Sequence, residues 1–178
     1  GQKKPIGNQL QVTILSMIPD VEKERGGITD YDLHSRFSNL IDPSKINREI
    51  DKLITNKFIQ KTNSGELQRL NGWIPLHKKM VALELKLSRI EDVLHQAICN
   101  LEFADESYAG FPLEVAAKLI RSKKKTEFVN NGIGILGITA NSCKLFLKSR
   151  PNKLQSNLIL QMYCAERFWR SYSKNNLA

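Results

Sequence analysis

The stretch Met80-Val-Ala-Leu-Glu84-Leu-Lys86-Leu-Ser-Arg89 decides how the second half of this 178-residue chain folds. Polar and apolar residues alternate in it, as they do in a β-strand, where residues two apart point to the same side of the sheet. We therefore expect a strand from Met80 to Leu87, with Glu84 and Lys86 side by side on one face. The opposite face is expected to pack against the core through Leu83, Leu85 and Leu87.

A carboxylate and an amine at this spacing suit metal and phosphate chemistry. The Glu84 carboxylate can hold Mg²⁺, and the Lys86 ammonium can orient an attacking water or neutralise charge on a phosphate. The alternative is a salt-bridged pair at the end of a strand, with no function beyond local stability. The spacing alone leaves both interpretations open.

Composition favours a soluble protein with a polyanionic partner. The chain carries 27 Lys and Arg against 18 Asp and Glu, a formal net charge of +9, which suits nucleic acid or an acidic membrane surface. Its three cysteines are far apart and form no C-x-x-C motif, so neither a zinc site nor a disulfide framework is indicated. Without a signal-like or membrane-spanning apolar run, we expect a cytoplasmic protein with no membrane partner.

The first seventy residues predict three helices and a hairpin. Apolar periodicity indicates helices over residues 8–18, 30–38 and 43–54, with Thr29 capping the second and Asp42 or Ser44 capping the third. Pro43 suits the first turn of that third helix. Two short strands then surround the turn residues Asn63-Ser-Gly65.

This half resembles the winged helix-turn-helix domains of bacterial and archaeal regulators. The resemblance is carried by Gly27-Ile-Thr-Asp-Tyr-Asp-Leu33, Ile46-Asn-Arg-Glu-Ile50 and Leu53-Ile-Thr-Asn-Lys-Phe-Ile59. It implies a third helix in the major groove of double-stranded DNA and a wing that touches the backbone or minor groove. The implied contacts are Ser44, Lys45, Asn47 and Arg48 on the helix, and Lys61 and Arg69 on the wing. Winged helices also serve as protein–protein modules, so that alternative stays open.

Beyond residue 70 the pattern alternates between strands and helices. Strands are expected over residues 80–87, 106–112, 131–139 and 142–148, the last one antiparallel or at an edge, and helices over 88–103, capped by Ser88, and 114–128. This order implies a mainly parallel sheet covered by helices. A helical apolar stripe after Pro151 either covers that sheet or mediates a homodimer.

The second half resembles the PD-(D/E)xK nuclease superfamily. The resemblance is carried by Val81-Ala-Leu-Glu84-Leu-Lys86-Leu, Leu94-His-Gln96-Ala-Ile-Cys-Asn100 and Phe103-Ala-Asp105-Glu-Ser-Tyr108. It implies that Glu84 is the metal-binding acid, Lys86 the catalytic lysine and Gln96 a helix glutamine close to the active site. Asn100 stands where the RecB-like branch of the superfamily has a tyrosine.

One expected acid is missing from this pattern. The superfamily has a second acid on the preceding strand, but the chain has no Asp or Glu between Glu66 and Glu84, and Asn71 offers only a neutral oxygen. A lone carboxylate holds Mg²⁺ poorly. The nearby acids that could replace the missing one are Glu66, Glu91 and Asp92, each of which fits a solvated surface position better.

Two further features have competing interpretations. The run Arg121-Ser-Lys123-Lys124-Lys125 either grips phosphates or is a solvated helix end. Gly132, Gly134 and Gly137 have the spacing of a dinucleotide-binding loop, but they lie inside an apolar run, so a tightly packed strand is the better interpretation.

These patterns predict an α+β protein with a winged helix-turn-helix at residues 1–70 and a restriction-endonuclease-like α/β domain with a central mixed sheet at residues 71–178. The expected function is DNA binding, with either weak Mg²⁺-dependent cleavage or binding without cutting, and the missing acid favours the latter. The first alternative is a transcriptional regulator whose α/β domain serves dimerisation or ligand sensing. The second is a protein-interaction adaptor.

Overall fold

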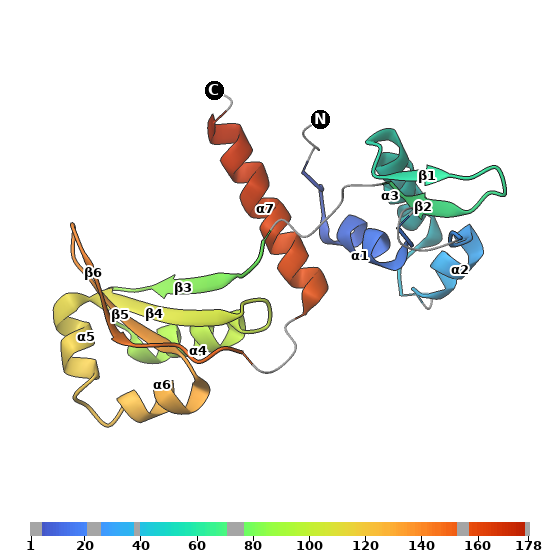
Figure 1. The fold of residues 1–178 in the computed structure, drawn as a ribbon. Coiled ribbons are helices and arrows are strands. Elements are labelled where there is room, and N and C mark those ends of the chain that lie inside the picture. The colour runs from blue at the N-terminus through green and yellow to red at the C-terminus, as the bar shows by residue number, and fades with distance from the viewer. Residues whose placement is uncertain (1–4, 21–25, 38–39, 71–76, 153–156, 177–178) are drawn as a thin grey trace. The chain divides into compact units, whose positions relative to one another are not determined.

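The chain divides into two compact units in the computed structural model (Figure 1). One comprises Gly1–Leu76 with Met162–Ala178, and the other comprises His77–Gln161. The structure describes residues 5–20, 26–37, 40–70, 77–152 and 157–176. The last seventeen residues, which the sequence pattern assigned to the second domain, therefore group with the first unit.

The first unit contains the expected three helices and hairpin (Figure 1). The elements are α1 (Gln9–Met17), α2 (Asp30–Ser35), α3 (Pro43–Thr55), β1 (Ile59–Lys61) and β2 (Leu67–Arg69). The two strands pair antiparallel across a turn in which Gly65 has a φ of 85°. Ile28, just before α2, forms an antiparallel bridge with Leu67 and extends this small sheet.

Local capping explains where these helices begin. Thr29 accepts a hydrogen bond from the backbone N–H of Asp32, and Asp42 accepts one from Ser44, with Pro43 in the first turn of α3. These caps satisfy backbone donors that a helix start otherwise leaves unpaired. The predicted caps at Thr29 and Asp42 are confirmed.

A buried carboxylate links α1 to α3. Glu49 is 3% exposed, and its oxygens accept hydrogen bonds from Asn8 Nδ2 (3.0 Å), Gln11 Nε2 (2.8 Å) and Lys52 Nζ (2.8 Å). Burial by itself raises the pKa of Glu49, but the hydrogen bonds from Lys52, Asn8 and Gln11 outweigh it and hold the pKa below the usual value for glutamate. The ionised carboxylate therefore stabilises the folded unit.

Because the folded-state pKa of Glu49 is depressed, its contribution is present above the ordinary glutamate pKa and is lost as the pH falls through the folded value. We expect the free energy of unfolding to fall below about pH 4.3, and to fall less steeply in Glu49→Gln. Urea titrations at several pH values, followed by circular dichroism, measure this. A variant with the same acid slope as the wild type would contradict the assignment.

The second unit is built on a four-stranded mixed sheet in the order β3-β4-β5-β6. The strands are β3 (Val81–Leu85), β4 (Glu106–Pro112), β5 (Gly134–Ile138) and β6 (Cys143–Leu147). The first three are parallel, and β6 is antiparallel at the edge, as predicted. The helices of the chain's second half are α4 (Ile90–Asn100), α5 (Leu113–Leu119), α6 (Lys125–Asn131) and α7 (Leu158–Asn176).

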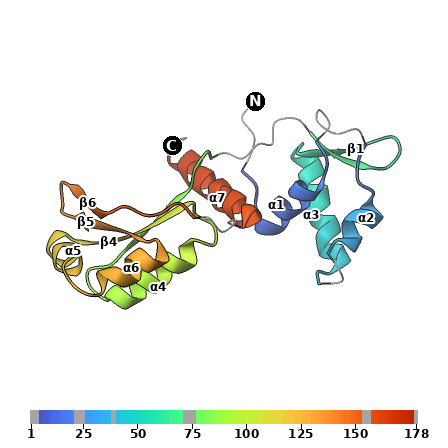
Figure 2. The same cartoon turned by 60° about the horizontal axis from the view of Figure 1, so that its bottom comes forward.

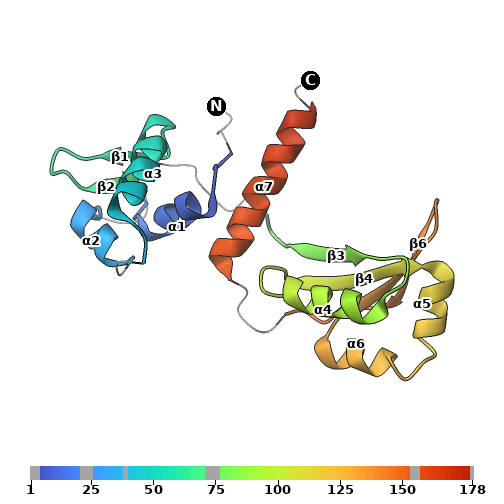
Figure 3. The same ribbon diagram turned by 180° about the vertical axis from the view of Figure 1, so that it is seen from behind.

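Helices α4, α5 and α6 all pack on one face of this sheet. The core joins Val93 of α4, Leu119 of α5 and Phe128 of α6 to Phe111 and Ile135, which lie on the same face of β4 and β5. Figure 2 shows α4 and α6 side by side on that face, and Figure 3 shows α4 along β3 and β4 from behind. The hydrophobic core therefore lies between this face and the three helices.

The expectation for the back of β3 is wrong. Leu83, Leu85 and Leu87 are 45%, 54% and 82% exposed, and Val81 is 52% exposed. Because α4, α5 and α6 pack on the other face of this sheet, the side chains of β3 that alternate away from these helices remain exposed. The helices cover the face that carries Glu84, whereas the sequence pattern predicted that they would cover the face that carries the leucines.

Two helix boundaries also differ from the prediction. The expected helix over residues 114–128 is two helices, because the chain turns between Ile120 and Lys124. Helix α4 has no side-chain cap: Arg89, in the left-handed conformation with a φ of 46°, precedes its first residue, so Ser88 is not the cap. The lysine run therefore leads into α6 instead of ending a helix.

Gly134 allows close packing within the sheet. A Cβ atom at Gly134 would overlap the ring of Tyr108 and lie 2.9 Å from the backbone nitrogen of Ser149. We expect Gly134→Ala to lower the free energy of unfolding by about 1–3 kcal/mol, the usual cost of overpacking. Urea denaturation measures this, with Lys118→Ala at an exposed position of α5 as a control that should leave the stability unchanged. Unchanged stability for Gly134→Ala would contradict the close packing.

Candidate functional site

Glu84 and Lys86 form an ion pair on the helix-covered face of β3. Lys86 Nζ lies 3.2 Å from Glu84 Oε1, and the side chains of Lys86 and Glu84 are 39% and 22% exposed. Their register on the sheet is fixed by the backbone, since Lys86 N–H donates to the carbonyl of Gly110 on β4 (3.2 Å). The predicted side-by-side arrangement of this pair is confirmed.

Gln96 is exposed on α4, and helix geometry puts it on the flank opposite to Glu91. Glu91 faces the start of α6, because its carboxylate accepts a hydrogen bond from Lys124 Nζ (2.7 Å), and α6 packs on β5. Gln96 follows Glu91 by five residues, about 140° around the helix. The flank that carries Gln96 is therefore turned away from the start of α6.

The residues around Glu84 do not fit a magnesium ion. Mg²⁺ takes about six oxygen ligands, usually with at least one or two carboxylates, and here the single carboxylate already faces an ammonium group. Among the described residues, no three His, Cys, Asp or Glu side chains lie close enough together to hold a metal. Asn71, the neutral donor near the expected second acid, lies outside the described residues.

The three acids considered as replacements have partners of their own. Glu91 binds Lys124, Asp92 lies 2.5 Å from Arg89 Nη2, and Glu66 accepts a hydrogen bond from Ser64 Oγ (3.3 Å) within the hairpin loop. The hydrogen bond from Lys124 holds the pKa of Glu91 below its usual value. Each of these three acids is therefore held by a partner other than Glu84 or Lys86.

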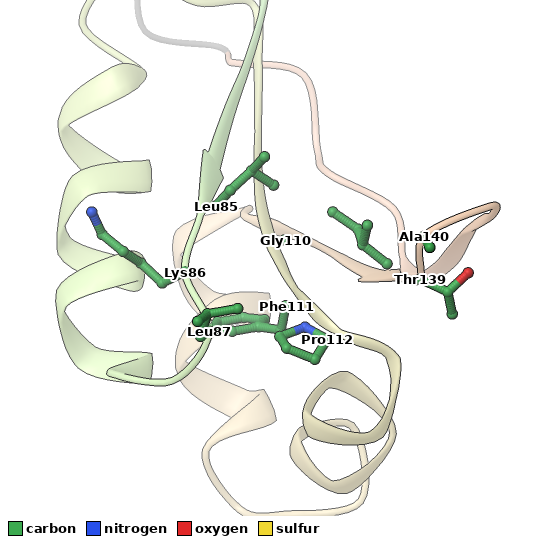
Figure 4. Close-up of a pocket in the computed structure, with 9 residues that line it drawn as sticks. Leu85, Lys86, Leu87, Gly110, Phe111, Pro112, Thr139 and Ala140 are labelled. Atoms are coloured by element: carbon green, nitrogen blue, oxygen red, sulfur yellow. The ribbon is translucent and has the colours of Figure 1, made fainter.

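A cavity of about 490 Å³ opens at the carboxyl ends of the parallel strands (Figure 4). This is the edge of an α/β sheet at which ligands commonly bind. The lining is mostly apolar, with Leu85, Leu87, Phe111 and Pro112, and Lys86 is its one charged residue. In Figure 4 the Lys86 amine points toward α4, on the other side of the strand from Leu85. This cavity suits an apolar group better than a phosphate.

Helix α3 presents the four side chains that the winged-helix resemblance implicated. Ser44, Lys45, Asn47 and Arg48 are exposed, whereas Ile46, Ile50 and Leu53 of the same helix are buried. Asn47 Oδ1 accepts a hydrogen bond from His34 Nε2 (2.8 Å), which orients its amide group. Arg48 Nε lies 3.6 Å from Glu49, but its side chain is 63% exposed. The four form a polar, basic surface.

The two residues predicted on the wing differ in environment. Lys61 is exposed on β1 and forms an ion pair with Asp30 (2.6 Å). Arg69 is only 17% exposed: its Nη1 donates to the carbonyl of Leu15 (3.3 Å), and its Nη2 lies 3.4 Å from Asp20. Arg69 therefore holds the inside of the first unit together, whereas Lys61 remains at the surface.

The lysine run at the start of α6 is only partly free to meet a ligand. Lys123 is exposed and Lys125 is half-buried, whereas Lys124 binds Glu91, which raises the pKa of Lys124. These lysines lie at the positive end of a helix, so the local backbone adds to their attraction for anions. The run remains a candidate phosphate contact in the second unit.

A second charged cluster, at the start of β4, has no signal in the sequence. Lys79 Nζ lies 2.7 Å from Glu106, which is 8% exposed and also accepts a hydrogen bond from Tyr108 (3.1 Å). The hydrogen bond from Lys79 holds the pKa of Glu106 below its usual value, and burial raises the pKa of Tyr108. Neither sequence spacing nor a known motif joins Lys79 to Glu106, which are 27 residues apart.

Comparisons with protein-family models, with curated proteins and with solved structures find no match to this chain. Among the helices in the described ranges, none is long and apolar enough to cross a membrane. Any functional assignment therefore depends on the geometry of the two units.

The Glu84–Lys86 pair contributes little to stability because both side chains reach solvent. We expect Glu84→Ala and Lys86→Ala each to change the free energy of unfolding by less than about 1 kcal/mol. Chemical denaturation of the purified variants tests this. A loss several times larger would mean that the pair has a structural role, and the two substitutions would then be poor probes of function.

Proposed function

We propose that this chain is a DNA-binding protein in which a winged helix is joined to a PD-(D/E)xK-like unit that binds nucleic acid without cutting it. The observation that carries the proposal is the outward face of α3, where Ser44, Lys45, Asn47 and Arg48 are exposed together. A helix that presents short polar and basic side chains can read base edges while it contacts phosphates.

The arrangement of the first unit supports the winged-helix assignment. Three helices are followed by an antiparallel hairpin, and the bridge from Ile28 to Leu67 ties the segment before α2 to that hairpin. In winged helices the third helix enters the major groove and the wing contacts the backbone. Lys61 would supply the wing contact here, and Arg69 is left out of the proposed interface because it is mostly buried.

Two properties support a nuclease-like second unit that binds instead of cleaving. The parallel β3-α4-β4 arrangement carries Glu84 and Lys86 on the face toward α4, with Gln96 exposed on that helix. Residues 77–161 have 13 Lys and Arg against 8 Asp and Glu, an excess suited to a phosphate backbone. The single carboxylate is the reason to exclude efficient Mg²⁺-dependent cleavage from the proposal.

Binding of the full chain to a labelled DNA duplex, measured by fluorescence anisotropy across a salt series, tests the proposal. The affinity should fall as salt rises, and Arg48→Ala should weaken binding about tenfold and reduce the salt slope by about one if Arg48 contacts a phosphate. Arg170→Ala, which removes an exposed arginine of α7 outside the proposed interface, is the matched control and should bind like the wild type. Salt-independent binding, or none, would contradict the proposal.

The second candidate is a winged-helix regulator whose α/β unit senses a ligand, and the apolar cavity at the carboxyl ends of β3, β4 and β5 favours it. Lys86→Ala separates the two functions. If both units contact DNA, Arg48→Ala and Lys86→Ala should each weaken DNA binding. If the chain is a ligand-sensing regulator, only Arg48→Ala should weaken DNA binding.

A further inference from the structure

Strand β3 has an outer edge with no hydrogen-bonded neighbour among the described residues. The hydrogen bond from Lys86 N–H to Gly110 shows that the backbone groups of Lys86 face β4, and so do those of Glu84. The backbone N–H and C=O groups of Leu83 and Leu85 therefore point away from the sheet. Backbone groups that point outward from an edge strand in this way are a template for another strand.

The side chains along this edge lack the usual protection. Natural edge strands are commonly blunted by charged side chains, proline or bulges, which prevent unwanted pairing. Here Val81, Leu83 and Leu85 are about half exposed on the open face of the sheet. The only charges within the strand and its next residue are Glu84 and Lys86, which lie on the other face and have opposite signs.

We propose that the β3 edge is the surface at which a second copy of this chain binds, by antiparallel pairing of residues 83–87 of the two copies about Leu85, the last residue of β3. In this register Glu84 of each copy stands opposite Lys86 of the other copy, so the symmetry creates two opposite-charge pairs. Leu83 stands opposite Leu87 of the second copy, which lies at the bend two residues past the end of β3. The strand is thus complementary to itself in both charge and apolar character.

The backbone directions agree with this register. Leu85 of both copies would exchange hydrogen bonds, since its N–H and C=O groups point outward. Glu84 and Lys86 of the second copy then form a non-hydrogen-bonded pair, the type in which side chains approach most closely. Pairing about Glu84 would set two glutamates opposite each other, and pairing about Leu83 would set Glu84 opposite Ala82.

Charge reversal at these two positions tests the interface without DNA, so its outcome is independent of the proposed function. Sedimentation equilibrium of the full chain should show a dimer. Glu84→Lys and Lys86→Glu should each dimerise roughly tenfold more weakly, because each variant opposes like charges across the two-fold axis. An equimolar mixture of the two variants should regain dimer, because positions 84 and 86 then carry two lysines in one chain and two glutamates in the other.

Two controls make the result specific to the β3 edge. The double variant with Glu84→Lys and Lys86→Glu in one chain keeps both charge pairs and should dimerise like the wild type, even if a single variant fails to fold. Glu91→Lys and Lys124→Glu, made singly, reverse one charge each of another surface ion pair in the same unit. Each should dimerise like the wild type. A monomeric wild type, or a dimer that tolerates the single reversals, would overturn the proposal, as would a mixture that stays monomeric.

Discussion

The parallel register of β3 on β4 is the constraint on which the second unit depends. Glu84 lies opposite Ala109, and Lys86 N–H donates to Gly110. Because side chains alternate along a strand, this register assigns Ala82, Glu84 and Lys86 to the side of the three helices. A shift by one residue would put leucines beneath α4 and the charged pair on the open face.

Much of the fold follows from local patterns in the sequence. Short-range signals, such as Thr29 and Asp42 as helix caps and the turn at Gly65, predict elements well because each acts within a few residues. The alternation in β3 predicted the strand and the Glu84–Lys86 pair, but it could not say which face the helices cover. The break after Ile120 was missed because lysines have good helix propensity, and only the packing of α6 on β5 reveals the turn.

Part of the candidate site was also predictable, because some of its residues are close together in the sequence. Two residues on one strand have a fixed relation, so Glu84 and Lys86 meet as expected. Arg69 could not be recognised as an internal residue, because its partner Asp20 is 49 residues away and the ion pair depends on how the hairpin packs. Lys79 and Glu106 are likewise far apart in the sequence, so their ion pair could not be predicted from local spacing.

Among the residues that the structure describes, no three His, Cys, Asp or Glu side chains lie close enough together to hold a metal, and this is why the proposed function is binding and not catalysis. In a metal-dependent phosphodiesterase, a metal ion held by acidic residues orients the attacking water and neutralises the negative charge that develops on the leaving oxygen. Here the Lys86 ammonium occupies the neighbourhood of the one carboxylate, so the pair is electrically balanced without a cation. Under the proposed function, a nucleic-acid partner would contact the basic surface and not a metal centre.

Incubation of supercoiled plasmid with the purified full chain and Mg²⁺ or Mn²⁺, beside Glu84→Ala and Lys86→Ala, tests this central claim most directly. Gel mobility at low salt reports DNA binding in the same samples. We predict that the plasmid is bound and remains supercoiled with every protein. Metal-dependent nicking by the wild type that disappears in both variants would contradict the account and would identify a working nuclease.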